Sequence, residues 1–216
     1  MNILSYDLYF FDCDGVILDS NSIKTNAFQK TLKNLNSDNI DTFLEFHLKN
    51  NGISRIEKFR YYLNNISHLH DISSLNLFLN EFHKIVLRDL YSCSFINGFL
   101  EFILFLKKNK KKCFVISAGS DKELELVFKK KNIIKYFEGI YGSSCTKQKH
   151  IRSILNLYGN QNGVFFGDSK NDYIVSKTMM LDFIFIFGKS NWVDFKKYNL
   201  DRIFKDFDHI NYLKRY

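Results

Sequence analysis

Two aspartates one residue apart are the first side chains in this sequence that could do chemistry. Asp12 and Asp14 stand in the segment Asp-Cys-Asp-Gly-Val, directly after an apolar run. Two carboxylates in different environments can divide the work of a reaction, because one stays ionised and attacks while the other carries a proton. Gly15 lets the chain turn sharply after them. A turn after a strand often contains the same residue types, so the pair alone does not indicate a catalytic site. It does so only together with other groups.

A second acidic pair lies far along the chain. Asp168 and Asp172 belong to the segment Gly-Asp-Ser-Lys-Asn-Asp, again after an apolar run. Their i, i+4 spacing brings both carboxylates to the same side of a turn. Mg²⁺ typically binds a few carboxylates and completes its octahedron with waters and phosphate oxygens. The pattern is therefore typical of a magnesium site, and the alternative is a helix cap with Asp172 in the first turn.

Two groups that could hold a phosphate lie between these pairs. Ser117 follows an apolar run, and its hydroxyl together with backbone N–H groups such as that of Ala118 would form an anion site before a predicted helix. Serine is also a common helix N-cap, which is the simpler interpretation. Lys147 stands at the predicted start of a helix, where the helix dipole disfavours a cation. That placement indicates a partner anion, and Lys149 is the rival candidate for this role.

Short apolar runs place all of these residues at the ends of predicted strands. Runs rich in aromatic and β-branched residues suit strands that are buried on both faces, and helical patterns separate them along the chain. The runs cover residues 8–11, 113–116, 164–166 and 183–187, with a weaker one at 139–141. This alternation predicts an α/β fold with a central parallel sheet and helices on both faces. The carboxyl ends of such strands share one edge, where ligands bind.

The segment between the first two predicted strands breaks this alternation. From about residue 21 to residue 92 the sequence shows only helical patterns, including an apolar stripe formed by Leu75, Phe78, Leu79, Phe82, Ile85 and Val86. A helical insertion at this point predicts a small all-helical cap over the catalytic edge of the sheet. We therefore expect a catalytic core formed by residues 1–18 and 93–216, and a cap domain formed by residues 19–92.

Together, the four motifs resemble the signature motifs of haloacid dehalogenase superfamily phosphatases. The resemblance covers nearly the whole chain and rests on Asp12-x-Asp14-Gly15, Ser117, Lys147 and Gly167-Asp168-Ser169-x-x-Asp172. It implies a Rossmann-like three-layer core with an inserted helical cap of the C1 type, as in the phosphoglucomutase-like branch. It also implies a phosphatase that acts on a small phosphorylated metabolite, such as a sugar phosphate or a sugar-acid phosphate.

The resemblance also implies a role for each motif. Asp12 attacks phosphorus and forms an aspartyl phosphate, and Asp14 is the general acid/base. Mg²⁺ is held by Asp12, by the main-chain carbonyl of Asp14 and by Asp168, with Asp172 as a direct or indirect ligand. The phosphate-binding groups are Ser117, Ala118 and Lys147.

The predicted cap carries candidate substrate contacts. Gly52-Ile53-Ser54-Arg55 is similar to a Gly-x-x-Arg element of phosphoglucomutase-like caps, in which the arginine reaches a substrate anion. Lys58 lies three residues on, on a neighbouring helical face. Together with Lys24 and Arg60, these cations could form a second anion site for a carboxylate or a second phosphate.

Three positions depart from the family pattern. Ser144 stands where many members have proline, and Ala118 stands where asparagine or glycine is frequent. Cys13 replaces a bulkier apolar residue between the two aspartates, and we expect it to point into the core. None of these changes removes a catalytic group.

The composition is that of a folded protein without a targeting segment. Of its 216 residues, 45% are hydrophobic and 17% aromatic, which is ample for a packed core. The N-terminus lacks a secretory signal and the longest apolar stretch is too short to cross a bilayer, so we expect a cytoplasmic monomer or dimer without a membrane partner. The four cysteines show no CxxC spacing, which argues against a disulfide framework or a zinc site. His68 and His70 are predicted to be surface residues.

Two other functions stay open at this stage. A phosphomutase needs the same four motifs under a cap that excludes water, and Arg55 keeps this alternative open. The net charge of +8 is compatible with a non-catalytic nucleic-acid-binding protein. However, the lysines are spread along the chain and a complete acidic site would repel phosphates, so we expect no nucleic-acid partner. Asp14 argues against the dehalogenase branch, which lacks a second carboxylate in the first motif.

Overall fold

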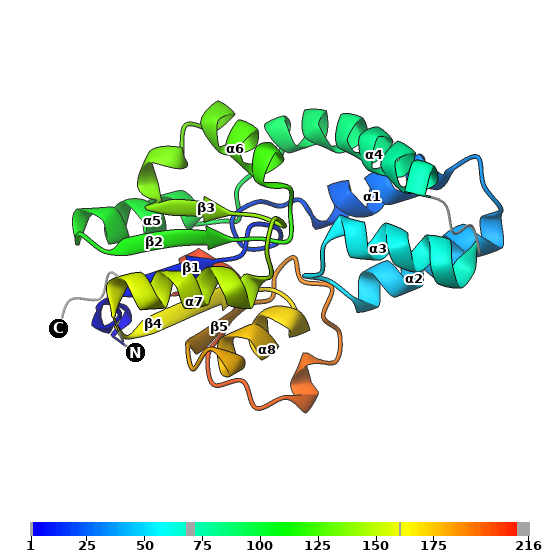
Figure 1. Ribbon diagram of the computed structural model, residues 1–216. Helices are drawn as coiled ribbons and strands as arrows, with labels where there is room; N and C mark the ends of the chain where they lie inside the picture. Colours follow the sequence, from blue (N-terminus) through cyan, green and yellow to red (C-terminus); the bar gives the residue numbers. More distant parts are fainter. Residues whose placement is uncertain (1, 68–71, 160, 211–216) are drawn as a thin grey trace.

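A six-stranded parallel sheet forms the centre of the molecule. The computed structural model describes residues 2–67, 72–159 and 161–210, so His68 and His70 lie outside the described residues. The strand order is β3-β2-β1-β4-β5-β6, and every neighbouring pair is parallel (Figure 1). The strands are β1 Leu8–Phe11, β2 Lys112–Ile116, β3 Gly139–Tyr141, β4 Gly163–Gly167, β5 Asp182–Ile186 and β6 Ile203–Phe204. The predicted parallel α/β fold is thereby confirmed.

Strand β1 lies in the middle of the sheet and is buried on both faces. Its side chains alternate, so that Tyr9 and Phe11 belong to one apolar cluster while Leu8 and Phe10 belong to another. The ring of Phe11 stacks on that of Phe166 in β4, with 4.8 Å between the ring centroids. These two residues are also register partners, which brings the segments after β1 and β4 to the same edge.

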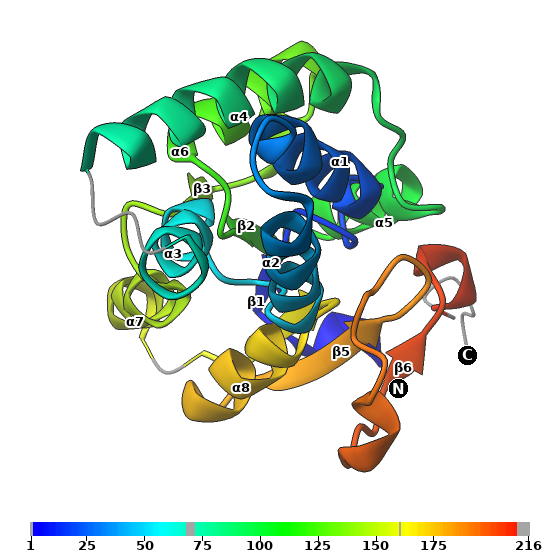
Figure 2. The same cartoon turned by 90° about the vertical axis from the view of Figure 1, so that its right-hand side faces the viewer.

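Helices cover both faces of the sheet and give three layers, as Figures 1 and 2 show. One face packs against α5 Phe99–Lys108 and α6 Asp121–Lys130, and the other against α7 Lys147–Tyr158 and α8 Lys170–Thr178. Short 3-10 helices are formed by Ile3–Ser5, Ile134–Tyr136, Phe195–Lys197 and Phe207–His209. The sequence patterns do not predict β6, because two residues at a sheet edge are too few to form a recognisable apolar run.

The helices between β1 and α5 form a cap beyond the carboxyl ends of the strands (Figure 1). Its elements are α1 Asn21–Leu32, α2 Ser37–Lys49, α3 Arg55–Tyr61, the π-helical turn Tyr62–Ile66 and α4 Ile72–Ser92. Aromatic side chains hold these helices together. The ring of Phe28 in α1 lies 5.4 Å from Phe43, 5.2 Å from Phe59 and 4.4 Å from Phe82, measured between centroids. These contacts join α1 to α2, α3 and α4, and the rings belong to the same apolar cluster as Tyr9 and Phe11.

The chain enters and leaves the cap through two segments that lie side by side. The backbone N–H of Asp19 donates to the carbonyl of Ser94 at 2.9 Å. The N–H of Ile96 donates to the carbonyl of Ile17 at 3.0 Å. We call residues 17–19 and 94–96 the two crossings.

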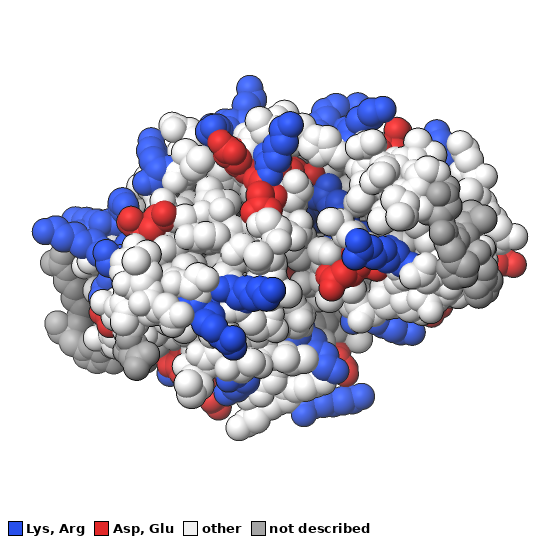
Figure 3. Space-filling view, viewed as in Figure 1, with Lys and Arg blue, Asp and Glu red and all other residues white. Residues whose placement is uncertain are grey.

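Basic side chains are spread over the face of the molecule that Figure 3 shows. Neutral and acidic residues separate most of them, and one group of basic side chains lies at the left edge, where Figure 1 shows the ends of α5 and β2. Within the residues that the structure describes, no helix combines the length and the apolar character that a membrane crossing needs.

Candidate active site

Three carboxylates from two distant parts of the chain meet at the carboxyl edge of the sheet. Asp12 follows β1, Asp168 follows β4, and Asp172 lies in the first turn of α8. One oxygen of each lies within 4.8 Å of the others, and all three residues are buried. We name these three residues the acidic cluster. The fold thus brings together three of the four residues that the sequence indicates as metal ligands.

The negative charge of the acidic cluster is only partly compensated. Burial raises the pKa of Asp12 to about 7, although Lys147 lies beside it. Burial, followed by the charges of Asp12 and Asp172, raises the pKa of Asp168 well above its ordinary value. A divalent cation would stabilise the ionised carboxylates, and hard oxygen donors are the ligands that Mg²⁺ prefers. The donor set therefore fits a magnesium ion.

Lys147 is the cation of this cluster. Its Nζ donates to Asp12 Oδ1 at 2.8 Å and to Asp172 Oδ1 at 2.6 Å. Helix α7 begins at this lysine, with Thr146 as N-cap, so the ammonium group lies against the dipole but close to two carboxylates. These carboxylates outweigh the effect of burial and raise the pKa of Lys147 above its ordinary value. The rival candidate, Lys149, is exposed on the same helix.

Asp172 is fixed by the start of helix α8 as well as by Lys147. Its Oδ2 accepts hydrogen bonds from the hydroxyl of Ser169 at 2.7 Å and from the backbone N–H of Ser169 at 3.2 Å. The Ser169 hydroxyl is in turn the acceptor for the N–H of Asp172, which completes a capping box. Asp172 therefore caps a helix and also belongs to the acidic cluster, so the two interpretations of this motif are compatible.

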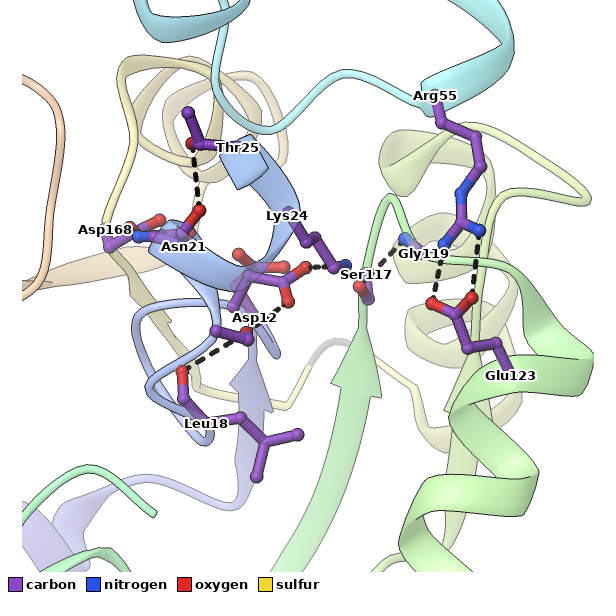
Figure 4. A network of polar contacts seen from close by, with 12 residues as sticks. Asp12, Leu18, Asn21, Lys24, Thr25, Arg55, Ser117, Gly119, Glu123 and Asp168 are labelled. Atoms are coloured by element: carbon purple, nitrogen blue, oxygen red, sulfur yellow. Dashed lines mark hydrogen bonds and ion pairs between the residues drawn. The ribbon is translucent and has the colours of Figure 1, made fainter. Parts of the chain in front are cut away.

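Asp14 has a different environment from Asp12. Its Oδ1 accepts from the hydroxyl of Ser20 at 2.5 Å, and its Oδ2 forms an ion pair with Lys24. Burial alone would raise the pKa of Asp14, but Lys24 and Ser20 outweigh it and hold the pKa below its ordinary value. Figure 4 shows Lys24 extending from α1 toward the loop that carries Asp12. The two neighbouring aspartates thus differ in their ease of ionisation, and within the protein alone Asp14 ionises more easily than Asp12. A cation bound by Asp12 would favour its ionised form, which a nucleophile needs.

Asn21 joins the cap to the acidic cluster. Its side-chain NH₂ donates to Asp168 Oδ2 at 2.7 Å, and Figure 4 shows these two side chains next to each other. It also donates to the carbonyl of Lys189 at 2.8 Å. Gly15 makes this approach possible, since a Cβ at that position would overlap the carboxylate of Asp168 and the amide of Asn21. The backbone of Gly15 also has a φ of +74°, which favours glycine. Motif spacing alone gives no signal for Asn21, because its partner lies far away in the sequence.

Ser117 and Ala118 follow β2 at the same edge of the sheet. Ser117 is buried, and its hydroxyl accepts a hydrogen bond from the N–H of Gly119 at 3.0 Å (Figure 4). Ala118 lines a cavity together with Asp12. Ser117, Ala118 and Lys147 also line a neighbouring hollow between the core and the cap. The three predicted phosphate-binding residues therefore lie around one region next to the acidic cluster.

Arg55 connects the cap to the core through a carboxylate that the sequence patterns did not single out. Its guanidinium donates to Glu123 of α6 in a bidentate arrangement, with distances of 2.9 Å and 2.5 Å (Figure 4). Both side chains are buried, and the guanidinium also lies over the ring of Phe82. Arg55 outweighs burial and lowers the pKa of Glu123. Glu123 escapes detection because an acidic residue in the first turn of a helix is common on electrostatic grounds.

Replacing Glu123 by glutamine is expected to open the cap. The loss of one partner from a buried ion pair costs about 3–5 kcal/mol if the other charge stays buried. If the cap moves away from the core, the guanidinium of Arg55 becomes exposed to water and this free-energy cost is avoided. The variant should therefore show a larger radius of gyration in solution X-ray scattering.

The matched control for this experiment is Glu125→Gln. Glu125 lies on the same helix but is exposed, and its ion pair with Lys129 links successive turns of α6 only. This variant should scatter like the unmodified protein. An unchanged radius for Glu123→Gln as well would show that this ion pair does not hold the cap closed.

The remaining candidate cations of the cap have different positions. Lys58 is buried and lines the cavity with Asp14 and Asp168. Lys24 lines it too, although Asp14 is its ion-pair partner. Arg60 is exposed and is not among the residues that line the cavity.

The cavity lies between the core and the cap and is nearly filled by side chains. Core residues such as Asp12 and Asp168 line one side of it, and cap residues such as Lys58 line the other. The free space is about 50 Å³. A single water needs about 10–15 Å³ measured in this way, so the cavity holds only a few waters. A phosphorylated metabolite can enter only when the cap moves away from the core.

Comparison with known protein families agrees with this geometry. The model of the family described as haloacid dehalogenase-like hydrolase matches residues 9–186. That range includes the acidic cluster and strands β1 to β5, apart from Leu8, the first residue of β1. A search of the curated proteins finds no sequence match.

Solved structures share the fold at low sequence identity. One is a predicted phosphoglycolate phosphatase from Haemophilus somnus, with a TM-score of 0.77 and 16% identity over 95% of this chain and 96% of that chain. Another is CbbY from Rhodobacter sphaeroides in complex with phosphate, with a TM-score of 0.76 and 14% identity over 95% and 96% of the two chains. A haloacid dehalogenase-like hydrolase from Streptococcus pneumoniae gives a TM-score of 0.69 and 19% identity over 93% and 94%.

Proposed function

Because the chain belongs to the haloacid dehalogenase-like hydrolases, we propose that it is a magnesium-dependent phosphatase that releases phosphate from a small phosphorylated metabolite. The observation that carries this proposal is the acidic cluster, in which Asp12 lies beside Asp168 and is paired with Lys147. A nucleophile, a metal site and a cation at one point are what phosphoryl transfer requires.

The proposed reaction uses the two aspartates of the first motif in turn. Asp12 attacks the phosphorus in line and forms an aspartyl phosphate, while Asp14 protonates the leaving oxygen. Asp14 then takes a proton from the water that hydrolyses the aspartyl phosphate, and inorganic phosphate leaves. The ion pair with Lys24 supports this second step, because it favours the ionised form of Asp14. The groups that would compensate charge on the transferred oxygens are Ser117, Ala118 and Lys147.

The magnesium ion would be held by Asp12, Asp168 and the main-chain carbonyl of Asp14. Asp172 would support this site through Lys147 and its helix cap, or bind directly. When bound, Mg²⁺ supplies the positive charge that lets an anionic substrate approach an anionic nucleophile. The hard oxygen donors and the raised pKa values of the buried carboxylates support this choice of ion.

We assign residues 1–18 and 93–216 to the catalytic core and residues 19–92 to the cap. The aromatic contacts that Phe28 makes with other cap helices support this division. The small closed cavity supports a reaction cycle in which the cap opens for substrate entry and closes for chemistry.

Replacing Asn21 by alanine is expected to weaken magnesium binding. Asn21 donates to Asp168, and groups that orient a metal ligand typically contribute about 10–100-fold to metal affinity. The concentration of Mg²⁺ that gives half-maximal phosphate release should rise by a factor in this range. Asn26→Ala is the matched control, because Asn26 is exposed on the same helix. Equal magnesium dependence of both variants would contradict the role of Asn21.

The proposed function is tested by incubating the purified protein with a panel of phosphorylated metabolites and measuring inorganic phosphate. We expect release from at least one sugar phosphate or phosphorylated acid in the presence of Mg²⁺ and none with a chelator. The absence of release from every member of the panel would contradict the proposal.

A phosphomutase is the alternative that product analysis separates from a phosphatase. The alternative rests on Arg55, which would bind a bisphosphate intermediate while it reorients under the cap. However, both terminal nitrogens of this guanidinium already donate to Glu123. We therefore favour hydrolysis, which yields free inorganic phosphate. An isomerised sugar phosphate as the main product would favour the mutase instead.

A further inference from the structure

Lys58 differs from the other cations that line the cavity. Lys24 is paired with Asp14, and Arg55 is paired with Glu123. The Nζ of Lys58 has no carboxylate within ion-pair distance among the described residues, although the side chain is only 4% exposed. Its hydrogen-bond partner is His47, through Nδ1 at 2.8 Å and the carbonyl oxygen at 3.5 Å. A buried cation without a counter-charge is costly, so a ligand anion at this point would be favourable.

A chain of hydrogen bonds fixes the tautomer of His47. The hydroxyl of Thr25 donates its one proton to the carbonyl of Asn21 at 3.0 Å. Its contact with His47 Nε2 at 2.9 Å therefore requires that Nε2 carries the proton and donates. The Nδ1 atom is then free to accept from Lys58. Burial and the nearby charge of Lys58 agree with a neutral ring, because they lower the pKa of His47 to about 3.

This arrangement leaves the ammonium group of Lys58 with unused hydrogen-bonding capacity. An ammonium group has three N–H donors, of which His47 takes one at a short distance and one at a long distance. The ring of Phe28 lies 5.6 Å from Nζ and supplies no acceptor atom. The group also lines the cavity that contains Asp14 and Asp168. Thr25 and His47 thus leave the ammonium group of Lys58 without a counter-charge. Burial, together with the charge of Lys24, lowers the pKa of Lys58 to about 7, and an anion bound beside it would favour its charged form.

We propose that Lys58 anchors a carboxylate of the substrate, so that the enzyme acts on short phosphorylated hydroxy acids, and this inference rests on the proposed phosphatase function. The phosphoryl group would lie at the acidic cluster and the carboxylate at Lys58. One free positive charge next to a neutral histidine matches a group with a single negative charge better than a second phosphate dianion.

Two substrates that differ only at the far end test this inference. 2-Phosphoglycolate carries a carboxylate, and 2-hydroxyethyl phosphate carries a hydroxymethyl group in its place. With Mg²⁺, the unmodified enzyme should prefer phosphoglycolate by about 10–100-fold in kcat/KM, as expected for a hydrogen bond between charged groups. In Lys58→Met the ratio should fall to about 1, mainly through KM. Lys58→Arg should recover part of the preference.

Two further variants separate this inference from its alternatives. Lys49→Met is the matched control, since Lys49 is exposed on α2, and it should keep the ratio of the unmodified enzyme. If Arg55→Met abolishes the preference and Lys58→Met does not, the substrate displaces Glu123 and the inference is wrong. It is also wrong if the unmodified enzyme hydrolyses both substrates equally well.

A binding experiment tests Lys58 without turnover. Asp12→Asn should be stabilised against thermal unfolding by phosphoglycolate more than by 2-hydroxyethyl phosphate when Mg²⁺ is present. This difference should disappear in Asp12→Asn/Lys58→Met, and its persistence there, or its absence in Asp12→Asn itself, would overturn the inference. Failure of the unmodified enzyme to release phosphate from any compound would contradict the phosphatase function instead, whatever the binding result.

Discussion

Replacing Asp12 by asparagine is expected to lower phosphate release by about 10⁴-fold or more, as typical for the loss of a nucleophile. The amide has nearly the shape of the carboxylate, but it cannot form the aspartyl phosphate. The fold should persist, because the substitution removes a buried negative charge that is unfavourable enough to raise the pKa of Asp12 to about 7. Phosphate release and circular dichroism measure the two effects separately.

The control for this variant is Asp7→Asn. Asp7 is exposed just before β1, so its side chain should not contribute to turnover. Substantial phosphate release by Asp12→Asn would show that another residue attacks the phosphorus. A loss of activity in Asp7→Asn of the same size would point to a general disturbance of β1.

Lys147→Met should have the second-largest effect, on activity and on stability. Turnover should fall by about 10²–10³-fold, because the variant lacks the cation beside Asp12 that would compensate charge on the transferred oxygens. Without magnesium, the free energy of unfolding should fall by about 3–5 kcal/mol, since Asp12 and Asp172 lose their buried cation. Urea denaturation with and without Mg²⁺ measures the stability, and added Mg²⁺ should recover part of the loss.

The pH dependence of this stability loss has a definite sign. A carboxyl whose pKa is raised by folding stabilises the protein at low pH and loses this contribution as the pH rises through its folded pKa. For Asp12 that value is about 7 with Lys147 present, and it should be higher without it. The metal-free Lys147→Met protein should therefore become progressively less stable, relative to the unmodified protein, as the pH rises above about 7 towards the higher pKa of Asp12 in the variant.

Lys149→Met is the control for Lys147→Met and also tests the rival assignment. Lys149 lies on the same helix and is exposed, so its loss should change activity and stability little. If Lys149→Met instead costs more activity than Lys147→Met, Lys149 is the cation that contacts the phosphoryl group.

The strands and the acidic residues at their ends are predictable from the sequence for one physical reason. A strand buried on both faces needs a continuous apolar run, so Leu8–Phe11 and Gly163–Gly167 stand out from their surroundings. Polar residues directly after such runs lie at one edge of a parallel sheet. Asp12 and Asp168 can therefore be placed near one another without knowledge of the structure.

The partners of the cap residues are not predictable in the same way. Arg55 and Lys58 are visible as cations on one short helix, but the sequence does not show that Glu123 holds the first and His47 the second. The pairing of Arg55 with Glu123 depends on how far the cap closes over the core, and the pairing of Lys58 with His47 depends on how α2 and α3 pack within the cap. The same holds for Asn21, whose contact with Asp168 forms only because the end of β4 lies beside the start of α1.

The two crossings have a consequence for how such an enzyme can be modified. The carbonyl of Ser94 lies within hydrogen-bonding distance of the N–H of Asp19, so the ends of the intervening stretch are neighbours in space. A short turn could join them after the whole stretch is excised, and a foreign sequence with adjacent ends could replace it without breaking any strand pairing. The cap that lies between the two crossings is therefore a module that recombination could replace in one step.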